Sequence, residues 1–275
     1  MTERTEPGLF QGTAWYYARF RPGYPPDLID LIAARFGGHA EARALDLGTG
    51  TGQLAIPLAE HFAEIVAVDP EPAMLAAASA AAVHAGVSNV RFVAGSSRTL
   101  ADLSAGYGHF DVVTMGSSFH WMDRDATLRA LDRMVRPGGG VVLAGNGGIV
   151  WNGGEPWHAA ARTVIQRWLG EDRRAGGGVY VNPEPAERHE VVLARSPFAA
   201  FEEYHWSVRR HHTLDQLCGL LSSTSFASPT LLGEQRPAFE ADLRQTLEPL
   251  LVKGRLTEVV DVEAFLAWRG ERRDR

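Results

Sequence analysis

The sequence lacks several features that would assign a protein to a class at once. It has one cysteine, Cys218, which excludes an internal disulfide and fits a reducing compartment. No apolar run approaches the roughly 20 residues that a membrane-spanning helix needs. The opening stretch "MTERTEPGLF" lacks the apolar core of a signal peptide. We therefore expect a cytoplasmic protein that does not enter a membrane.

Excess positive charge and clusters of metal ligands are missing as well. The formal net charge is −6, which argues against a chain built to hold the phosphate backbone of a nucleic acid. Cysteine, histidine and acidic residues do not gather at the spacings of a metal site. His211 and His212 are adjacent, but adjacent side chains on a strand-like segment rarely bind one ion together. We expect neither a nucleic-acid partner nor a metal.

What the sequence does contain, over residues 25–150, is an alternation of helical segments with short apolar runs. These runs do not alternate internally between apolar and polar residues, which is typical of parallel strands covered on both faces. Right-handed crossovers between such strands give a doubly wound α/β domain. The predicted strands are residues 42–48, 64–69, 90–95, 110–117 and 138–147, and the predicted helices are residues 25–37, 53–62, 72–86 and 124–135.

The pattern changes after about residue 150. Residues 198–208 and 256–269 read as strands that extend the sheet, and the segment between them is helical. We interpret this helical segment, about 209–253, as a lid over the carboxyl ends of the strands. The expected division is therefore a covering segment over residues 1–24, an α/β core over residues 25–150, and a C-terminal part over residues 151–275 that completes the sheet and carries the lid.

The stretch "LDLGTGTGQLA", residues 45–55, combines a strand end, three glycines and a helix start. Such a loop presents free backbone N–H groups and the positive end of a helix, and glycine allows close approach and positive φ. As a dinucleotide fingerprint the loop is ambiguous, because Gly50-x-Gly52-x-x-Ala55 is a tolerated match. A plain tight turn is the structural alternative.

Two carboxylates decide between the candidate ligands. Asp46 stands just before the glycines, where it would repel a pyrophosphate and favour a cation. Asp69 ends the second predicted strand in "VAVDP", in position for both hydroxyls of a ribose, although it could also cap the following helix. An acid, a glycine turn and a second acid fit a nucleoside that carries a positively charged amino acid, which is S-adenosylmethionine.

Five ordered segments carry a family resemblance: "LDLGTGTGQLA", "VDPEPAML", "RFVAGSS", "FDVVTMGSSFHWMD" and "RMVRPGGGVVLAG". Together they resemble the class I S-adenosylmethionine-dependent methyltransferases. "YYARFRPGYP" and "FHWMD" are similar to the small-molecule branch (methyltransferase type 11) that includes trans-aconitate methyltransferase. The expected fold is a doubly wound, Rossmann-like α/β structure with a mixed seven-stranded sheet, its last strand antiparallel, and a helical lid.

The resemblance also implies roles for individual residues. Gly48, Gly50 and Gly52 would line the methionine part of the cofactor, with Asp46 at its amino end and Asp69 on its ribose. Tyr17 and Arg21 would contact the carboxylate end from a covering segment, although a surface segment anchored by its aromatic residues is the alternative. The remaining expected cofactor contacts are Pro70, Met74, Gly95, Ser96 and Ser97 around the adenine and Ser117 after the fourth strand. Many relatives have an acid beside Gly95, and this chain has serines there.

The tetrad "FHWM" follows the fourth predicted strand and is expected to face the transferred methyl group. His120 could accept a proton from a hydroxyl or an amine, and a packing or capping role is the alternative. Trp121 matches a tryptophan that holds the substrate carboxylate in carboxyl methyltransferases, and core filling is its alternative. Gln11 is a further candidate for that carboxylate. We take His120 and Trp121 as the predicted catalytic residues.

The sequence thus predicts a bacterial methyltransferase that acts on an oxygen, carboxylate or hydroxyl, of a small molecule in specialised metabolism, as a monomer or homodimer. Methylation of nitrogen or carbon on a natural-product scaffold is one alternative. A protein that binds S-adenosylmethionine without transferring its methyl group is a second, and a dehydrogenase is a third. RNA methylation is disfavoured because the chain has no basic tract and has "GSSF" where nucleobase amine methylation would want an N-P-P-Y-type tetrad.

Overall fold

The computed structural model describes residues 10–147, 150–151, 153–172, 174–175, 178–179 and 184–269. Residues 1–9 of the predicted covering segment and the last six residues of the chain lie outside these ranges. Among the helices that are described, none is long and apolar enough to cross a membrane.

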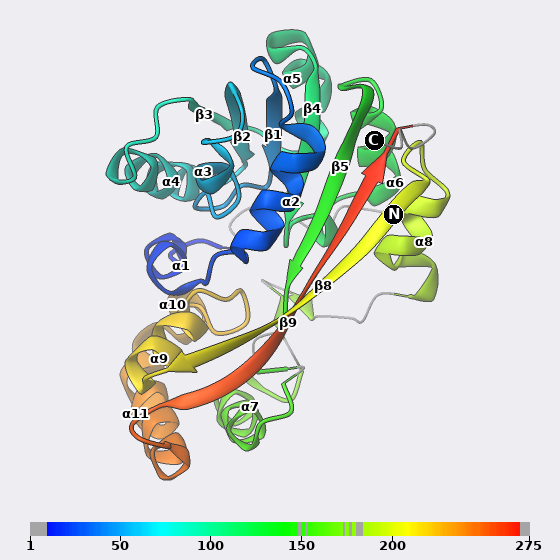
Figure 1. The fold of residues 1–275 in the computed structure, drawn as a ribbon. Coiled ribbons are helices and arrows are strands. Elements are labelled where there is room, and N and C mark those ends of the chain that lie inside the picture. Colours follow the sequence, from blue (N-terminus) through cyan, green and yellow to red (C-terminus); the bar gives the residue numbers. More distant parts are fainter. Residues whose placement is uncertain are drawn as a thin grey trace.

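A seven-stranded sheet forms the centre of the fold, with strand order β3-β2-β1-β4-β5-β9-β8 (Figure 1). Strands β1 to β5 are parallel to one another, and β9 is antiparallel to both of its neighbours. The predicted mixed, doubly wound sheet is confirmed. The strands are β1 (Arg43–Leu47), β2 (Glu64–Asp69), β3 (Val90–Ala94), β4 (Phe110–Gly116), β5 (Val135–Asn146), β8 (Ala200–His212) and β9 (Leu256–Trp268).

Helices cover both faces of the sheet because β1, β2, β4 and β5 are apolar on both sides. Residues of α2 (Pro26–Phe36) and α3 (Ala55–Leu58) share one buried cluster with one side of the strands. Residues of α5 (Leu100–Tyr107), α6 (Arg124–Leu131) and α8 (His189–Ala194) share a second cluster with the other side. The helix α4 (Pro72–His84) packs on β2 and β3. Regular helix is shorter than predicted at α3 and α6, whereas β5 begins three residues earlier than predicted.

The strands β8 and β9 continue beyond the sheet as a two-stranded arm. β9 pairs with β5 only from Val262 onward, but it pairs with β8 along its whole length, from Ala200↔Trp268 to His212↔Leu256. Figure 1 shows this arm running from the sheet to a separate group of helices.

The helices beyond the arm form one group, which we call the lid after the prediction for residues 209–253. It contains α9 (Leu214–Ser222), α10 (Pro229–Leu232) and α11 (Arg236–Leu247) from that segment, and α7 (Pro156–Leu169) from outside it. Trp157, Val164 and Ile165 of α7 are buried in the same apolar cluster as α9 and α11. The prediction left α7 outside the lid because α7 precedes β8 in the sequence. In the structure, α7 packs on α11. The short strands β6 (Arg174–Ala175) and β7 (Gly178–Val179) form a separate two-stranded sheet.

The covering segment is helical where the sequence suggested a stretch stiffened by prolines. Residues Ala14–Phe20 form α1, and the chain becomes extended at Arg21, one residue before Pro22. α1 lies between the core and the lid, in contact with α4 and α9. Its Phe20 ring occupies the space beside Gly219, where a Cβ would come within 2.4 Å of the ring. This close approach joins α1 to the lid.

Candidate active site

A pocket opens where the glycine loop, α1 and the arm meet, at the carboxyl ends of β1, β4 and β5. It encloses about 640 Å³ of space between the protein atoms, part of which is open to solvent. Its walls come from segments far apart in the sequence. They are Tyr17, Arg21, Pro22, Tyr24, Asp46, Gly48, Thr49, Gln53, Leu54, Gly116, Ser117, Asn146, Gly147, Arg210, Leu220, Glu258 and Val260.

The glycine loop has the backbone that its sequence predicts. Gly48, Gly50 and Gly52 have φ values of 76°, 56° and 87°, in the left-handed region that side chains disfavour. A Cβ on Gly48 would lie 2.5 Å from the Cβ of Ser118, whose hydroxyl donates to the Leu47 carbonyl at 2.7 Å. The glycine at this position is therefore required both by the turn and by the packing behind it.

Asp46 lines the pocket from the end of β1 and is almost fully buried. Its carboxylate accepts a hydrogen bond of 2.7 Å from the Thr114 hydroxyl on the neighbouring strand β4. Burial raises the pKa of Asp46 from 3.8 to about 6, the Thr114 hydrogen bond opposes that rise, and the charge of Asp69 adds to it. A positively charged ligand in the pocket would favour the ionised form.

Asp69 lies at the end of β2 and holds the glycine loop. Its two carboxylate oxygens accept hydrogen bonds of 2.9 Å from the backbone N–H groups of Gly50 and Glu71. Burial raises the pKa of Asp69, and these two hydrogen bonds oppose the rise. The carboxylate thus fixes the loop and the start of the following segment, and each oxygen has lone-pair capacity left for a further donor.

The residues expected around the adenine lie beside Asp69. The backbone N–H of Gly95 donates to the Asp69 carbonyl at 3.2 Å, which joins the ends of β2 and β3. Ser96 caps the short helix η1 (Ser97–Thr99) through its hydroxyl. Met74 is buried at the start of α4, and Pro70 is exposed. None of these residues belongs to the pocket lining, and neither do Asp69, Gly50 and Gly52.

Tyr17 of α1 and Arg21, the residue that follows α1, both line the pocket. The Arg21 guanidinium lies over the Tyr17 ring, 4.9 Å from its centroid, and donates to the Ser223 hydroxyl of the lid at 3.0 Å. Tyr17 lies over Gly50, where a Cβ would be 3.7 Å from the ring. A cation and an aromatic ring therefore cover the glycine loop from the side of the lid.

Tyr24 and Ser117 form a pair of hydroxyls 3.1 Å apart on the same wall. Burial raises the pKa of Tyr24, which keeps the phenol protonated. Ser117 has a φ of 52°, an unusual conformation for a residue other than glycine. Strained backbone at the end of a strand, beside a pocket, is common at functional sites. The sequence pointed to Ser117, and Tyr24 belongs to the stretch "YYARFRPGYP" that was expected to cover the cofactor, but Tyr24 was not chosen as a contact.

Three polar residues in the pocket were missed by the sequence reasoning: Asn146, Arg210 and Glu258. The Arg210 guanidinium donates to the Asn146 side-chain oxygen at 2.5 Å, and the Asn146 amide donates to the carbonyl of Pro22 at 3.1 Å. Burial lowers the pKa of Arg210. Glu258 lies in the predicted strand 256–269, but Arg210 falls in the segment 209–253 that was predicted as a helical lid. That prediction is wrong for residues 209–212, because β8 continues to His212 by pairing with β9. No local motif marked either residue.

His120 and Trp121 lie in a short helix, η2 (Phe119–Trp121), after β4. Both are half-buried, and their rings are 4.7 Å apart. The Phe10 ring makes edge contacts with Trp121 at 6.1 Å and with Tyr17 at 6.2 Å, so one ring separates Trp121 from the pocket wall. Gln11 is exposed, and its carbonyl accepts from Thr230 of the lid.

The residues present fit S-adenosylmethionine. The buried Asp46 carboxylate, with a second acid raising its pKa, suits the cationic amino acid, and Arg21 suits its carboxylate. The positive-φ glycines leave the backbone open to close approach. In the described part of the chain, no group of three potential metal ligands is arranged to hold an ion.

Comparisons with known proteins agree with this geometry. Residues 44–139 match a family model described as a methyltransferase domain. The chain is 34% identical over 210 residues to an uncharacterized methyltransferase of Mycobacterium tuberculosis, Rv3342, covering 76% of this chain and 74% of that protein. It is 33% identical over 131 residues to the ubiquinone biosynthesis O-methyltransferase of Acinetobacter baumannii, covering 46% of this chain and 54% of that one.

The fold has solved counterparts. A protein from Anaeromyxobacter dehalogenans, assigned as a type II methyltransferase, aligns with a TM-score of 0.63 at 21% identity, covering 91% of this chain and 98% of that one. The YcgJ protein of Bacillus subtilis aligns with a TM-score of 0.55 at 17% identity, covering 88% and 98%. The similarity to the mycobacterial protein, over most of both chains, establishes the family: this chain belongs to the class I S-adenosylmethionine-dependent methyltransferases, and S-adenosylmethionine is its methyl donor.

Proposed function

We propose that this methyltransferase acts on a small molecule and methylates an oxygen atom, with a carboxylate oxygen as the first choice. The observation that carries the proposal is the presence of two guanidinium groups, Arg21 and Arg210, in one pocket. The cofactor has one carboxylate, which Arg21 suits from its place over the glycine loop. Arg210 is then available for an anionic group of the acceptor. The setting that we propose is bacterial specialised metabolism.

A carboxylate acceptor also agrees with the other groups in the pocket. Bound S-adenosylmethionine supplies a methyl group on a positively charged sulfur, and its transfer to a carboxylate gives a methyl ester and a neutral thioether. A carboxylate needs no base, so the protein has only to orient it and to exclude water. Tyr24 is a protonated phenol and Arg210 a cation, so both can hold a carboxylate as hydrogen-bond donors.

His120 and Trp121 keep their predicted roles as part of this proposal. Trp121 lies one aromatic ring from the pocket wall, through Phe10. His120 would be the base for a hydroxyl acceptor and would be dispensable for a carboxylate. His120→Ala should therefore slow methylation of a hydroxyl by about 10²-fold and leave methylation of a carboxylate nearly unchanged.

Transfer of a labelled methyl group tests the proposal directly. The protein is incubated with methyl-labelled S-adenosylmethionine and a panel of small carboxylic acids, alcohols and amines, and the products are treated with alkali. A carboxyl methyl ester releases its label as volatile methanol, whereas an ether, an N-methyl or a C-methyl group retains it. Label that is volatile after alkali supports a carboxylate acceptor.

The alternatives give different results in the same experiment. Label that stays in an amine or on carbon would replace our proposal with N- or C-methylation. Tight binding of S-adenosylmethionine by calorimetry, with no S-adenosylhomocysteine formed from any acceptor class, would favour a binding protein. A comparison of NAD with S-adenosylmethionine in the same calorimeter separates a dehydrogenase from both.

A further inference from the structure

Arg210 and Glu258 are cross-strand partners on the arm. They lie directly opposite each other in the antiparallel register of β8 and β9, and both line the pocket. Opposite residues in such a ladder project to the same face with Cβ atoms about 5 Å apart. The arm thus presents a cation and an anion side by side to one ligand.

Glu258 is held in a fixed orientation by two histidines. His158 Nε2 lies 3.0 Å from one carboxylate oxygen, and His212 Nε2 lies 2.7 Å from the other. His158 Nδ1 accepts the backbone N–H of Glu155, so its proton is on Nε2 and is donated to Glu258. All three residues are buried where the arm joins α7. Glu258 is therefore a rigid acceptor, with lone pairs left over for the pocket.

The two charged groups differ from an ordinary surface ion pair. Burial by itself would raise the pKa of Glu258, but the hydrogen bonds from His158 and His212 outweigh it and hold the pKa at about 2. Arg210 is turned towards Asn146 by its 2.5 Å hydrogen bond. The guanidinium still has donors left, because it carries five N–H groups. Each residue is anchored by other groups and keeps capacity for a ligand.

We infer that Arg210 and Glu258 are the acceptor-recognition pair, and that the acceptor is a hydroxy acid whose carboxylate binds Arg210 while its hydroxyl donates to Glu258. This inference rests on the proposed methylation of a small carboxylic acid and names its substrate class. Cross-strand spacing suits a carboxylate and a hydroxyl on the same or neighbouring carbons. Asn146, which touches Arg210, fixes the guanidinium and is a positioning residue.

A hydroxyl suits Glu258 better than an ammonium group does. The negative charge of Glu258 already has a cation, Arg210, as its cross-strand neighbour, and two imidazole donors hold its oxygens. The bound cofactor adds a sulfonium and an ammonium group to the same pocket, so a third ligand cation would be repelled. A neutral donor satisfies the carboxylate without that repulsion.

The test uses three acids of one carbon skeleton, which carry hydroxyl, amino or hydrogen at the same position. Turnover is followed as S-adenosylhomocysteine, and acceptor affinity is measured by calorimetry on the protein saturated with S-adenosylhomocysteine. We expect the hydroxy acid to have a kcat/KM at least about 10-fold above the other two, the value of one hydrogen bond to a charged group. Glu258→Gln should remove most of this preference. Arg210→Gln should weaken the binding of all three acids by about 10- to 100-fold.

Matched substitutions on the same strands serve as controls. Arg209→Gln changes the exposed neighbour of Arg210 on the opposite face of β8. Glu263→Gln changes a half-buried acid of β9 that lies outside the pocket lining. Both should leave the preference and the cofactor affinity unchanged. Circular dichroism and thermal unfolding of each variant separate loss of recognition from loss of fold.

Other results would overturn the inference in distinguishable ways. If Arg210→Gln weakens S-adenosylmethionine binding as much as acid binding, Arg210 holds the cofactor. If Glu258→Gln leaves the preference for the hydroxy acid intact, Glu258 does not recognise a hydroxyl. The same conclusion follows if the wild-type protein prefers the amino-substituted acid. If the wild-type protein methylates amines and none of the acids, the proposed function itself fails, before either variant is considered. If it methylates alcohols and none of the acids, methylation of oxygen stands, but the carboxylate acceptor and the hydroxy-acid inference both fail.

Discussion

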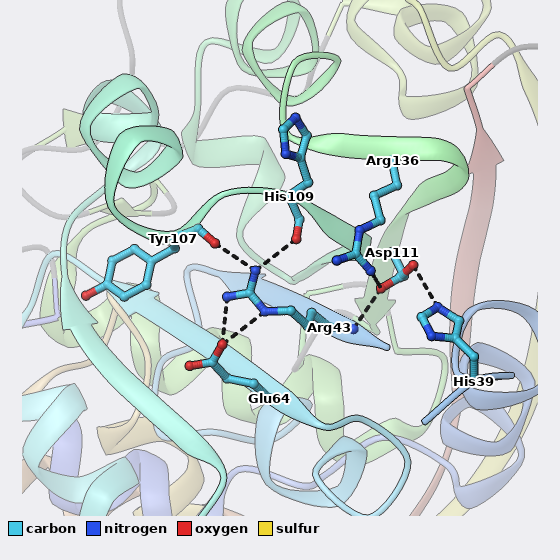
Figure 2. Close-up of polar contacts among 7 residues, drawn as sticks. All are labelled: His39, Arg43, Glu64, Tyr107, His109, Asp111 and Arg136. Carbon is cyan, nitrogen blue, oxygen red and sulfur yellow. Dashed lines mark hydrogen bonds and ion pairs between the residues drawn. The ribbon is translucent and has the colours of Figure 1, made fainter. Parts of the chain in front are cut away.

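The central sheet has one edge formed by the amino-terminal ends of its parallel strands and another formed by their carboxyl ends, and charged side chains are arranged differently at the two. At the amino-terminal edge, Arg43 donates to Glu64 at 2.6 Å and to the carbonyls of Tyr107 and His109 at 2.7 and 3.1 Å. Asp111 accepts from the Arg43 backbone and from Arg136, both at 2.8 Å. Figure 2 shows that these groups are hydrogen-bonded or ion-paired to one another, and that His39 contacts the network through Asp111.

At the carboxyl edge the charges are left open to a ligand. Burial raises the pKa of Asp46 to about 6 and lowers that of Arg210, and both groups line the pocket. The strands are the same, so the difference does not come from the sheet. It comes from the segments that adjoin each edge: short turns at one, and the glycine loop, α1 and the arm at the other. The closed edge serves stability, and the open edge serves binding.

We expect the largest effect from a substitution in the glycine loop of the carboxyl edge, where the backbone of Gly48 packs closely on Ser118. Gly48→Ala places a Cβ 2.5 Å from Ser118 on a backbone with a φ of 76°. If the loop keeps its position, strain and overpacking together should lower the free energy of unfolding by about 2–5 kcal/mol. If the loop shifts to relieve the contact, the protein should bind the cofactor more weakly. Urea unfolding and calorimetry measure the two. Gly86→Ala is the control, because Gly86 has a φ of 71° with nothing within 4 Å of the added atom.

A pair of aspartates, one at each edge, sharpens the comparison further. Asp69→Ala should weaken cofactor binding by about 1.5–3 kcal/mol through lost charged hydrogen bonds. Asp111→Ala should lower the urea midpoint and leave the cofactor dissociation constant of the folded protein unchanged, because its partners are Arg43, Arg136 and His39. A change in cofactor affinity from Asp111→Ala, or none from Asp69→Ala, would contradict the division between the edges.

The pH dependence of cofactor binding tests the openness of Asp46. An acid whose pKa is raised in the folded state must lose a proton before it binds a cation, so affinity should increase as pH rises through about 6. Between pH 5 and pH 7 the gain should be about 10-fold. The folded, unliganded protein binds this proton more tightly than the unfolded chain does. Its free energy of unfolding should therefore decrease as pH rises from about 4 to 6. Asp46→Asn should flatten both profiles, and a profile that survives this substitution would assign the titration to another group.

The smallest expected effect lies at the outer end of the closed edge. His39 is exposed, and its ion pair with Asp111 at 3.1 Å should be worth less than about 0.5 kcal/mol. His39→Ala should therefore leave both unfolding and cofactor affinity almost unchanged. A loss above about 1 kcal/mol in urea unfolding would mean that the closed network extends further than its buried members.

Much of the fold and of the cofactor side was predictable because its signals are local. The run of apolar residues in β2 and the spacing of the glycines at residues 48–52 are read within a few positions of the chain. Asp46 and Asp69 were found from their place at strand ends, and the structure brings them to the same edge. The segment 14–20 was harder to predict, because its helix depends on packing between the core and the lid.

The acceptor side was not predictable in the same way. Arg210 and Glu258 are 48 positions apart, and α7 supplies His158 from before β8. On a strand, alternate residues face opposite sides, and sequence alone does not say which side meets a pocket. The long arm made by β8 and β9 decides this, and its length depends on how the lid packs.

By itself the sequence determined the order of strands and helices, the glycine turn and the two carboxylates beside it, because hydrophobic runs and positive-φ turns are properties of short segments. The tertiary structure alone decided which polar side chains share a wall with that turn. A pocket wall is assembled from residues that are distant along the chain, and their meeting depends on strand register and on helix packing rather than on any local pattern.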